Sequence, residues 1–275
     1  MNGLDFGFGP IETEFWRWMF VMTRIGAAMI AAPIFGASGV PMQVRVVLTG
    51  AIAALVCAWT NVVVPPALLS ADGILWVAGE ALVGLSRGFV LQLTFAAPMI
   101  AAEVIGGGMG MSMASAADPN TGAQSTALGQ YYVVVLTLIF LSLGGHLQWL
   151  DLVVKSYQTF PPGQTWLGAD RIQAIAGFGS TMFLSAVAIA LPVTLVLLIV
   201  QVVAGVLSRS APALNLFALG LPAGVLAGLA ALIISAPMVA DQFADLTAQA
   251  IQQAGDVMTP IKATDVIPSI KAAPQ

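Results

Sequence analysis

Charged residues are what this sequence lacks most. Lys and Arg number 9 and Asp and Glu 13 among 275 residues, or 8% of the chain, whereas soluble domains carry about 25% charged residues. Hydrophobic residues make up 59% of the chain, and the mean hydropathy is +0.94. There are too few charges to cover a water-facing surface of this size, so the composition excludes an ordinary soluble domain and predicts a polytopic membrane protein.

Cysteine and histidine are also scarce. The single cysteine, Cys57, cannot form an internal disulfide or a thiolate metal cluster. His146 is the single histidine, and one histidine alone does not make a histidine-based metal site. Ser-His-Asp chemistry would have to rely on this one residue. A net charge of −4 with no basic run argues against a nucleic-acid partner. We therefore expect no cofactor, no metal and no enzymatic activity.

Long apolar segments are abundant. About 20 apolar residues cross a hydrocarbon core of roughly 30 Å, and the chain contains about six such segments, which predicts an all-α polytopic fold. The Lys and Arg residues of the connecting loops do not favour one membrane orientation. The segments cover approximately residues 15–35, 45–70, 74–105, 128–150, 172–208 and 214–240.

Several of these segments carry residues that interrupt helices. Prolines inside an apolar segment remove a backbone hydrogen bond, and we expect them to break the helices that contain them. We expect a single membrane domain over residues 1–250 and a polar, flexible C-terminal tail over 251–275. The prolines expected to interrupt the third, fifth and sixth segments are Pro98, Pro192, Pro222 and Pro237.

The most unusual segment runs from Gly106 to Pro119. Four of its first five residues are glycine, and such a run is not expected to form an ordinary helix. Bare backbone at membrane depth must be buried in protein or line a cavity, and methionine side chains repack around objects of varying shape. The segment is therefore either a deformable constriction or a glycine-rich loop near the bilayer surface. Its candidate residues are Gly106, Gly107, Gly108, Met109, Gly110, Met111, Ser112, Met113, Asp118 and Pro119.

Three charged residues, Glu80, Arg87 and Glu103, lie inside or beside the third apolar segment. Charges at such depth are costly and are usually paired or face water. Glu80 and Arg87 are two helical turns apart, too far for a direct short pair. Each could meet a partner from another helix or chain, snorkel at a helix end, or belong to an ion or proton relay of a small secondary transporter.

Short motifs occur in a characteristic order over residues 15–250. They are Arg24 with Ala32-Pro33, then Glu80, Glu103-x-x-Gly106-x-x-Met109-Gly110-x-Ser112-x-Ala114-x-x-x-Asp118-Pro119, Gly145-His146-Leu147, Ala190-Leu191-Pro192, and Arg209-x-Ala211-Pro212 through Gly220-x-Pro222. In this order and spacing the chain resembles the FliR family of flagellar export-gate subunits. It resembles more distantly the corresponding subunits of virulence type III secretion systems (injectisomes), which remain an alternative.

The resemblance implies a core subunit of the flagellar export gate, in the bacterial inner membrane at the basal body. Its implied partners are FliP-type and FliQ-type gate subunits, an FlhB-type switch protein, lipid, and transient unfolded export substrates. It implies no catalytic role, and a partly membrane-elevated helical assembly rather than six simple spans.

The resemblance also implies functional residues. It places a plug across the closed pore on Gly106 to Pro119, although close relatives carry aromatic residues where this chain has Met113 and Ala116. The charged residues of the apolar segments are then candidates for polar contacts inside the membrane or between subunits. These are Arg24, Glu80, Arg87, Glu103 and Arg209.

Overall fold

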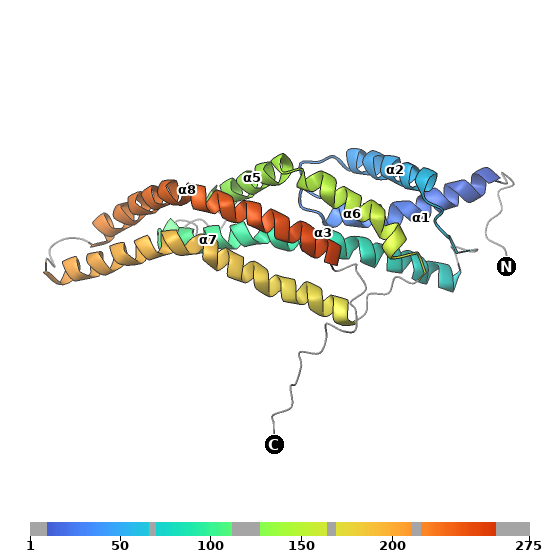
Figure 1. Ribbon diagram of the computed structural model, residues 1–275. Coiled ribbons are helices and arrows are strands. Elements are labelled where there is room, and N and C mark those ends of the chain that lie inside the picture. The colour runs from blue at the N-terminus through green and yellow to red at the C-terminus, as the bar shows by residue number, and fades with distance from the viewer. Residues whose placement is uncertain (1–9, 66–69, 112–126, 164–168, 211–215, 257–275) are drawn as a thin grey trace, which may run out of the picture.

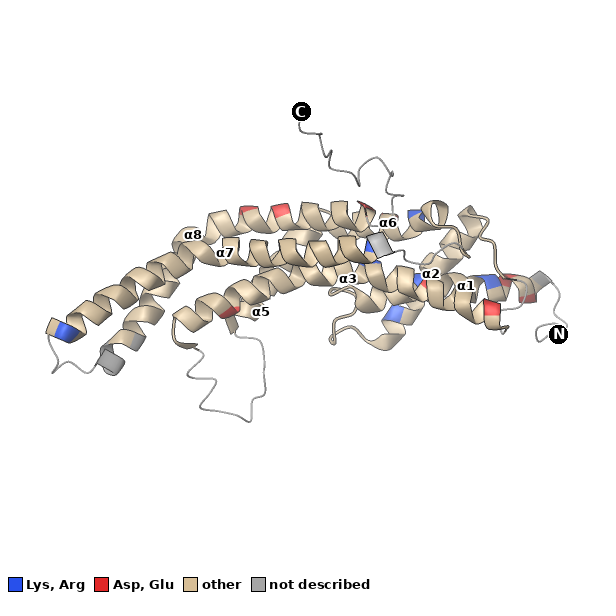
Figure 2. Ribbon diagram, turned by 90° about the horizontal axis from the view of Figure 1, so that it is seen from below, with Lys and Arg blue, Asp and Glu red and all other residues tan. Residues whose placement is uncertain are grey.

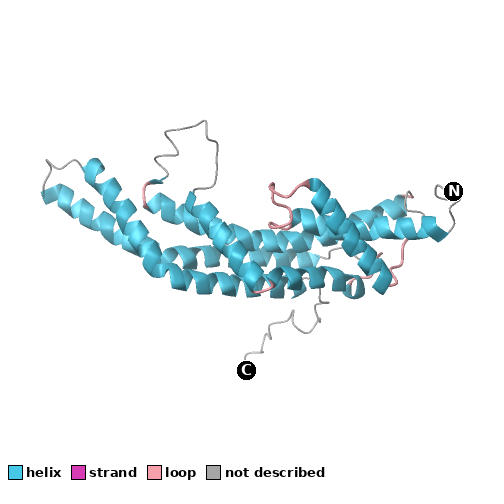
Figure 3. Cartoon of the chain, turned by 90° about the horizontal axis from the view of Figure 1, so that it is seen from above, coloured by secondary structure: helices cyan, strands magenta, loops and turns pink. Residues whose placement is uncertain are grey.

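The computed structural model describes residues 10–65, 70–111, 127–163, 169–210 and 216–256, and all regular structure in these ranges is helical. Figure 3 shows helices and no strand in the parts described. The helices are α1 (Pro10–Ala31), α2 (Met42–Trp59), α3 (Ala71–Gly108), α5 (Ala127–Ser142), α6 (Gly145–Thr159), α7 (Ala169–Ser210) and α8 (Leu216–Asp256).

The molecule is elongated, and α3, α7 and α8 run along it (Figure 1). Helices α1, α2 and α6 lie at the end near the N-terminus, whereas the hairpin of α7 and α8 extends past α3 at the opposite end. Helix α3 is the central element, because it packs against α1, α5, α7 and α8. Helices α1, α5, α7 and α8 are therefore positioned through α3, whereas α2 packs on α1.

Four helices are long and apolar enough to cross a membrane, counted over the described residues. They are Met42–Trp59, Ala71–Gly108, Arg171–Ser210 and Pro222–Asp256, and the bent pair of α5 and α6 makes a fifth if it counts as one span. The predicted all-α polytopic fold is confirmed. The predicted first segment corresponds to α1, which carries four charged residues and falls outside this group.

The expectation that prolines break the helices is wrong. Pro98 lies inside α3, Pro192 inside α7, and Pro222 and Pro237 inside α8, and each helix continues past them. Helices α7 and α8 instead bend near their middles (Figure 1), which is where Pro192 and Pro237 occur. A proline bends a helix without ending it when neighbouring helices hold both halves in place.

The fourth apolar segment, expected to be one helix, is the segment that breaks. Helix α5 ends at Ser142, α6 begins at Gly145, and the two bend by 68°. Gly144 between them has φ +69, a left-handed conformation that glycine adopts without steric cost.

Helix α8 continues through the polar sequence expected to follow the last apolar segment. It extends to Asp256 and buries Phe243, Leu246 and Ala250. Figure 2 shows that the acidic residues of α8 lie along this half of the helix. The tail was predicted over residues 251–275; residues 251–256 form the end of α8, and the rest lies outside the described residues.

Candidate functional site

Helices α1 and α3 cross closely at two glycines of α3. A Cβ atom added at Gly84 would lie 2.1 Å from the Arg24 carbonyl oxygen, and one at Gly88 would lie 2.5 Å from Ala31 Cβ. The two glycines are four residues apart and therefore share one face of α3. Small residues at this spacing let two membrane helices bring their backbones together. The bare face of α3 thus fixes where α1 crosses it.

One turn before this crossing, a buried ion pair joins the two helices. Arg24 Nε donates to Glu80 Oε2 at 2.7 Å, and Arg24 Nη2 donates to Glu80 Oε1 at 2.6 Å. Both side chains are 0% exposed. The paired planes of the two groups make a bidentate contact, the strongest geometry available to an arginine and a carboxylate.

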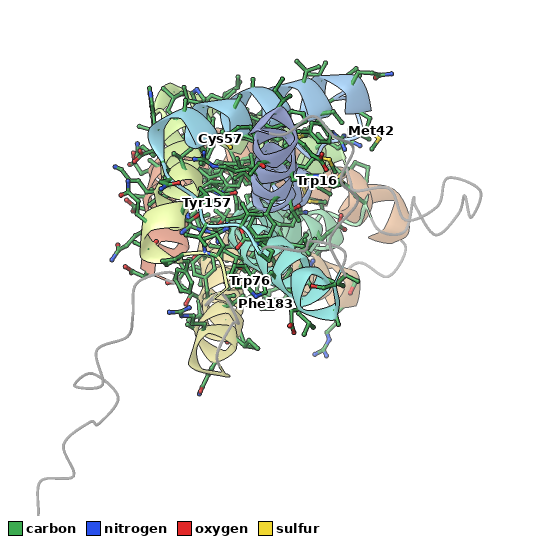
Figure 4. The ribbon with its side chains drawn as sticks, turned by 90° about the vertical axis from the view of Figure 1, so that its right-hand side faces the viewer. Trp16, Met42, Cys57, Trp76, Tyr157 and Phe183 are labelled. Carbon is green, nitrogen blue, oxygen red and sulfur yellow. The ribbon has the colours of Figure 1, made fainter. Side chains whose placement is uncertain are left out.

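The same guanidinium also holds α6. Arg24 donates to Ser156 Oγ at 3.0 Å and to the Phe160 carbonyl at 2.9 Å, and Phe160 follows the last residue of α6. The Tyr157 hydroxyl returns a hydrogen bond to the Val21 carbonyl of α1 at 2.8 Å, and its ring lies 4.2 Å from the Arg24 guanidinium carbon. Figure 4 shows Tyr157 within the helix cluster and Met42 at its edge. One arginine therefore connects α1, α3 and α6.

Arg87 is a second buried arginine of α3, with only 2% of its surface exposed. Its Nη1 donates to the Leu152 carbonyl of α6, and the indole of Trp149 donates to the Arg87 carbonyl at 3.4 Å. Its Nε is buried without a hydrogen-bond partner among the described residues. The sequence placed Glu80 and Arg87 too far apart to pair, and each meets a different helix.

Arg17 of α1 completes the polar contacts at this end of the molecule. Its Nη2 donates to the carbonyls of Cys57 at 2.9 Å and Thr60 at 2.5 Å, at the C-terminal end of α2. The last carbonyls of a helix have no partner within the helix and attract a cation. Sequence analysis did not single out Arg17, because its partners are 40 or more residues away.

The glycine run at 106–108 is helical, contrary to the sequence expectation. Gly106, Gly107 and Gly108 form the end of α3, and Met109 is its C-terminal cap. Tertiary contacts offset the low helix propensity of glycine here: Gln201 of α7 donates to the Gly108 carbonyl at 3.1 Å. At Gly110, with φ 81, the chain turns away from the helix, as is common directly after a helix end.

Met109 does not face an opening in this chain. Its side chain is 3% exposed and lies over Gly228 of α8. Met111 is partly buried, whereas Ser112, Met113, Asp118 and Pro119 lie outside the described residues. The structure therefore brings the first half of the predicted plug against α7 and α8.

The remaining predicted contact residues lie on the surface. Glu103 is on the exposed side of α3, three residues before the glycines, and Arg209 is exposed in the last turn of α7. Neither lies in the Arg24–Glu80 cluster. Among the described residues no group of three or more His, Cys, Asp or Glu could hold a metal ion. The buried charged residues Arg24, Glu80 and Arg87 make contacts between helices, so the arrangement is one that orients helices.

Large apolar side chains cover much of the outside. In the most apolar stretch of each helix, 17% of α8 and 28% of α7 are buried inside the chain, against 56% of α3. Ile199 of α7 is 64% exposed, and Ile233 and Ile234 of α8 are 75% and 81% exposed. This surface requires lipid or other apolar protein around it.

Comparison with known proteins adds a family to this geometry. Residues 15–250 match the family described as bacterial export proteins, family 1. The flagellar biosynthetic protein FliR of Escherichia coli (strain K12) is 30% identical over 242 residues, which cover 84% of this chain and 90% of the relative. FliR of Bacillus subtilis (strain 168) is 32% identical over 221 residues, covering 79% and 85%. The surface presentation of antigens protein SpaR of Salmonella typhimurium is 30% identical over 188 residues, covering 67% and 70%.

Proposed function

The chain belongs to the FliR family of bacterial export proteins, and from this membership we propose that it is the core membrane subunit of the flagellar protein export gate. In this role it forms part of the conduit through which unfolded flagellar proteins leave the cell. It acts in the inner membrane at the flagellar basal body, and its function is structural rather than enzymatic.

The observation that carries the proposal is the family match over residues 15–250, which includes nearly all of the described helices. The FliR relatives from Escherichia coli and Bacillus subtilis align with 84% and 79% of the chain, and SpaR aligns with 67%. The wider coverage favours the flagellar system over a virulence secretion system.

The partners we propose are FliP-type and FliQ-type gate subunits and an FlhB-type switch protein. The apolar outer faces of α7 and α8 support this proposal, because they leave most of both helices uncovered by the chain itself. We assign Glu103 and Arg209 to contacts between subunits, since both are exposed charges on predominantly apolar helices.

A secondary transporter is the rival from another functional class. An ion or proton path through Glu80 would need a carboxylate that water can reach. Both oxygens of Glu80 instead accept from Arg24, and the side chain is fully buried. This geometry suits a fixed contact between helices better than a relay.

Within the gate, we propose that the segment from Gly106 to Pro119 closes the idle conduit. A pore wide enough for an unfolded chain would otherwise leak ions. Deleting residues 111–119 leaves α3 and the Met109 contact in place, and should yield an assembled gate that conducts ions in a planar bilayer. A deletion complex as tight as wild type would show that the segment is only a connector.

Removal of the chain tests the main proposal. A strain that lacks it should assemble no flagella and release no flagellar proteins into the medium, and a tagged copy should restore both and copurify with FliP-type and FliQ-type subunits. Normal flagellar export without the chain would overturn the proposal. Loss of another secretion system with intact flagella would favour the virulence alternative.

A further inference from the structure

The contact of Met109 with Gly228 is the tightest apolar contact at the end of α3. A Cβ atom at residue 228 would lie 2.6 Å from Met109 Cγ, 2.8 Å from its Sδ and 2.9 Å from its Cε. The whole thioether side chain therefore lies across a position of α8 that has no side chain. Gly228 is itself buried.

The neighbouring glycine of α8 is a natural comparison. Gly224 lies one turn earlier on the same face, yet a Cβ there would meet only the Met109 carbonyl oxygen, at 3.7 Å. That distance is an ordinary van der Waals contact. Met109 fits in its place only because residue 228 has no side chain, whereas a side chain at residue 224 would leave Met109 undisturbed.

Met109 is also the point where the chain leaves α3. It is the C-terminal cap of the helix, and the left-handed Gly110 follows it. On the other side of the helix end, a Cβ at Gly108 would lie 3.0 Å from Leu197 Cδ1 of α7. The end of α3 is thus held between α7 and α8, and Met109 makes the contact with α8.

We propose that Met109 seated on Gly228 is the positioning contact of the closed gate: it holds the end of α3 against α8 while the gate is idle and separates when a chain passes. This inference rests on the proposed export function. A methionine side chain packed on bare backbone suits the role, because the contact is apolar and flexible and can separate without exposing an unpaired charge.

A reversible cross-link tests the separation. One carbon–carbon bond of about 1.5 Å joins Met109 Cγ to its Cβ, so Cβ atoms at 109 and 228 lie within about 4 Å, inside the disulfide range of about 3.5–4.5 Å. In a Cys57→Ala background, export through the M109C/G228C gate should stop when the cross-link forms and resume with dithiothreitol, relative to the same gate kept reduced. The single variants M109C and G228C are the controls.

Export that continues while the cross-link is fully formed would overturn the proposal, because the contact would then not need to separate. If the reduced double-cysteine gate exports nothing, the second experiment decides instead. Failure of the proposed export function would look different, because a strain that lacks the chain would then export as well as the wild-type strain.

The second experiment compares Gly228→Ala with Gly224→Ala. The alanine at 228 would lie 2.6 Å from Met109 Cγ and push the whole side chain off this position, so the assembled complex, isolated by size-exclusion chromatography, should leak ions in a planar bilayer. Gly224→Ala should remain tight. Met109→Ala should also leak, and adding it to Gly228→Ala should add little, because the two residues act through one contact. Equal tightness of Gly228→Ala and Gly224→Ala, or additive leaks, would overturn the proposal.

Discussion

At the scale of single residues, Arg24 and Glu80 decide how this end of the molecule is held. Arg24 satisfies a carboxylate on α3, a hydroxyl on α6 and the carbonyl that ends α6. Breaking a buried pair by removing one partner typically costs about 3–5 kcal/mol, because the other charge stays buried and unpaired. Arg24 therefore contributes more contacts than Glu80, since Arg24 connects three helices and Glu80 connects two.

Glutamine substitutions should expose this inequality. Arg24→Gln is expected to lower the thermal stability of the purified complex more than Glu80→Gln, and the double variant should lose less than the sum of the two singles. Unfolding of the complex in detergent, followed by intrinsic fluorescence, is the measurement. Strict additivity would mean that the two side chains do not depend on each other.

Gly84 is the second residue that the crossing depends on. Gly84→Ala places a methyl group 2.1 Å from a backbone oxygen that cannot rotate away, so α1 and α3 must move apart, and overpacking of this kind costs about 1–3 kcal/mol. Gly205→Ala in α7 is the matched control, because nothing lies within 4 Å of its added Cβ. Equal melting temperatures for the two variants would contradict the packing argument.

At the scale of helices, bends occur where the backbone changes direction at low cost. Pro192 of α7 and Pro237 of α8 lie where these helices bend but continue, whereas the left-handed Gly144 separates α5 from α6. The break redirects α6 so that it packs on α8 and α1 and reaches Arg24.

Substitutions at Gly144 should follow backbone preference alone, because a Cβ there meets nothing within 4 Å. Gly144→Ala is expected to destabilise the complex by about 1–2 kcal/mol, the cost of a left-handed residue with a side chain. Gly144→Asn should cost less, because asparagine tolerates this conformation better. Thermal unfolding of both variants checks the order, and an alanine variant as stable as wild type would argue against a left-handed residue at this position.

At the scale of the whole molecule, the chain is incomplete without apolar neighbours. Its long hairpin of α7 and α8 extends beyond the other helices (Figure 1) and exposes large aliphatic side chains. The buried polar cluster and the Met109 contact lie within the chain, whereas the exposed apolar faces point outward.

The isolated chain should therefore aggregate or be degraded when expressed alone. Coexpression with FliP-type and FliQ-type subunits should raise its yield and give a monodisperse complex in detergent, because these partners would cover the apolar faces. Size-exclusion chromatography of both preparations is the measurement. A monodisperse, thermally stable monomer would contradict the proposal.

Part of the site could be predicted from the sequence. Arg24 and Glu80 were candidates for polar contacts, because charges are costly in apolar segments. The Gly84-x-x-x-Gly88 spacing was visible too, but glycines at this spacing indicate a contact without saying which helix makes it. Gly228 and Arg17 could not be assigned, since their roles depend on residues far away in the chain.

The sequence by itself determined the environment, the helical class and the family, because apolar composition, segment length and ordered motifs are properties of the chain read in one dimension. Only the tertiary structure decided which helices bend and which break, which charges pair, and where the glycine run at 106–108 lies. The physical reason is that proline and glycine set which backbone conformations are possible without selecting one of them. Whether a helix continues through them depends on neighbours that hydrogen-bond and pack against it, as Gln201 and Leu197 do for the end of α3.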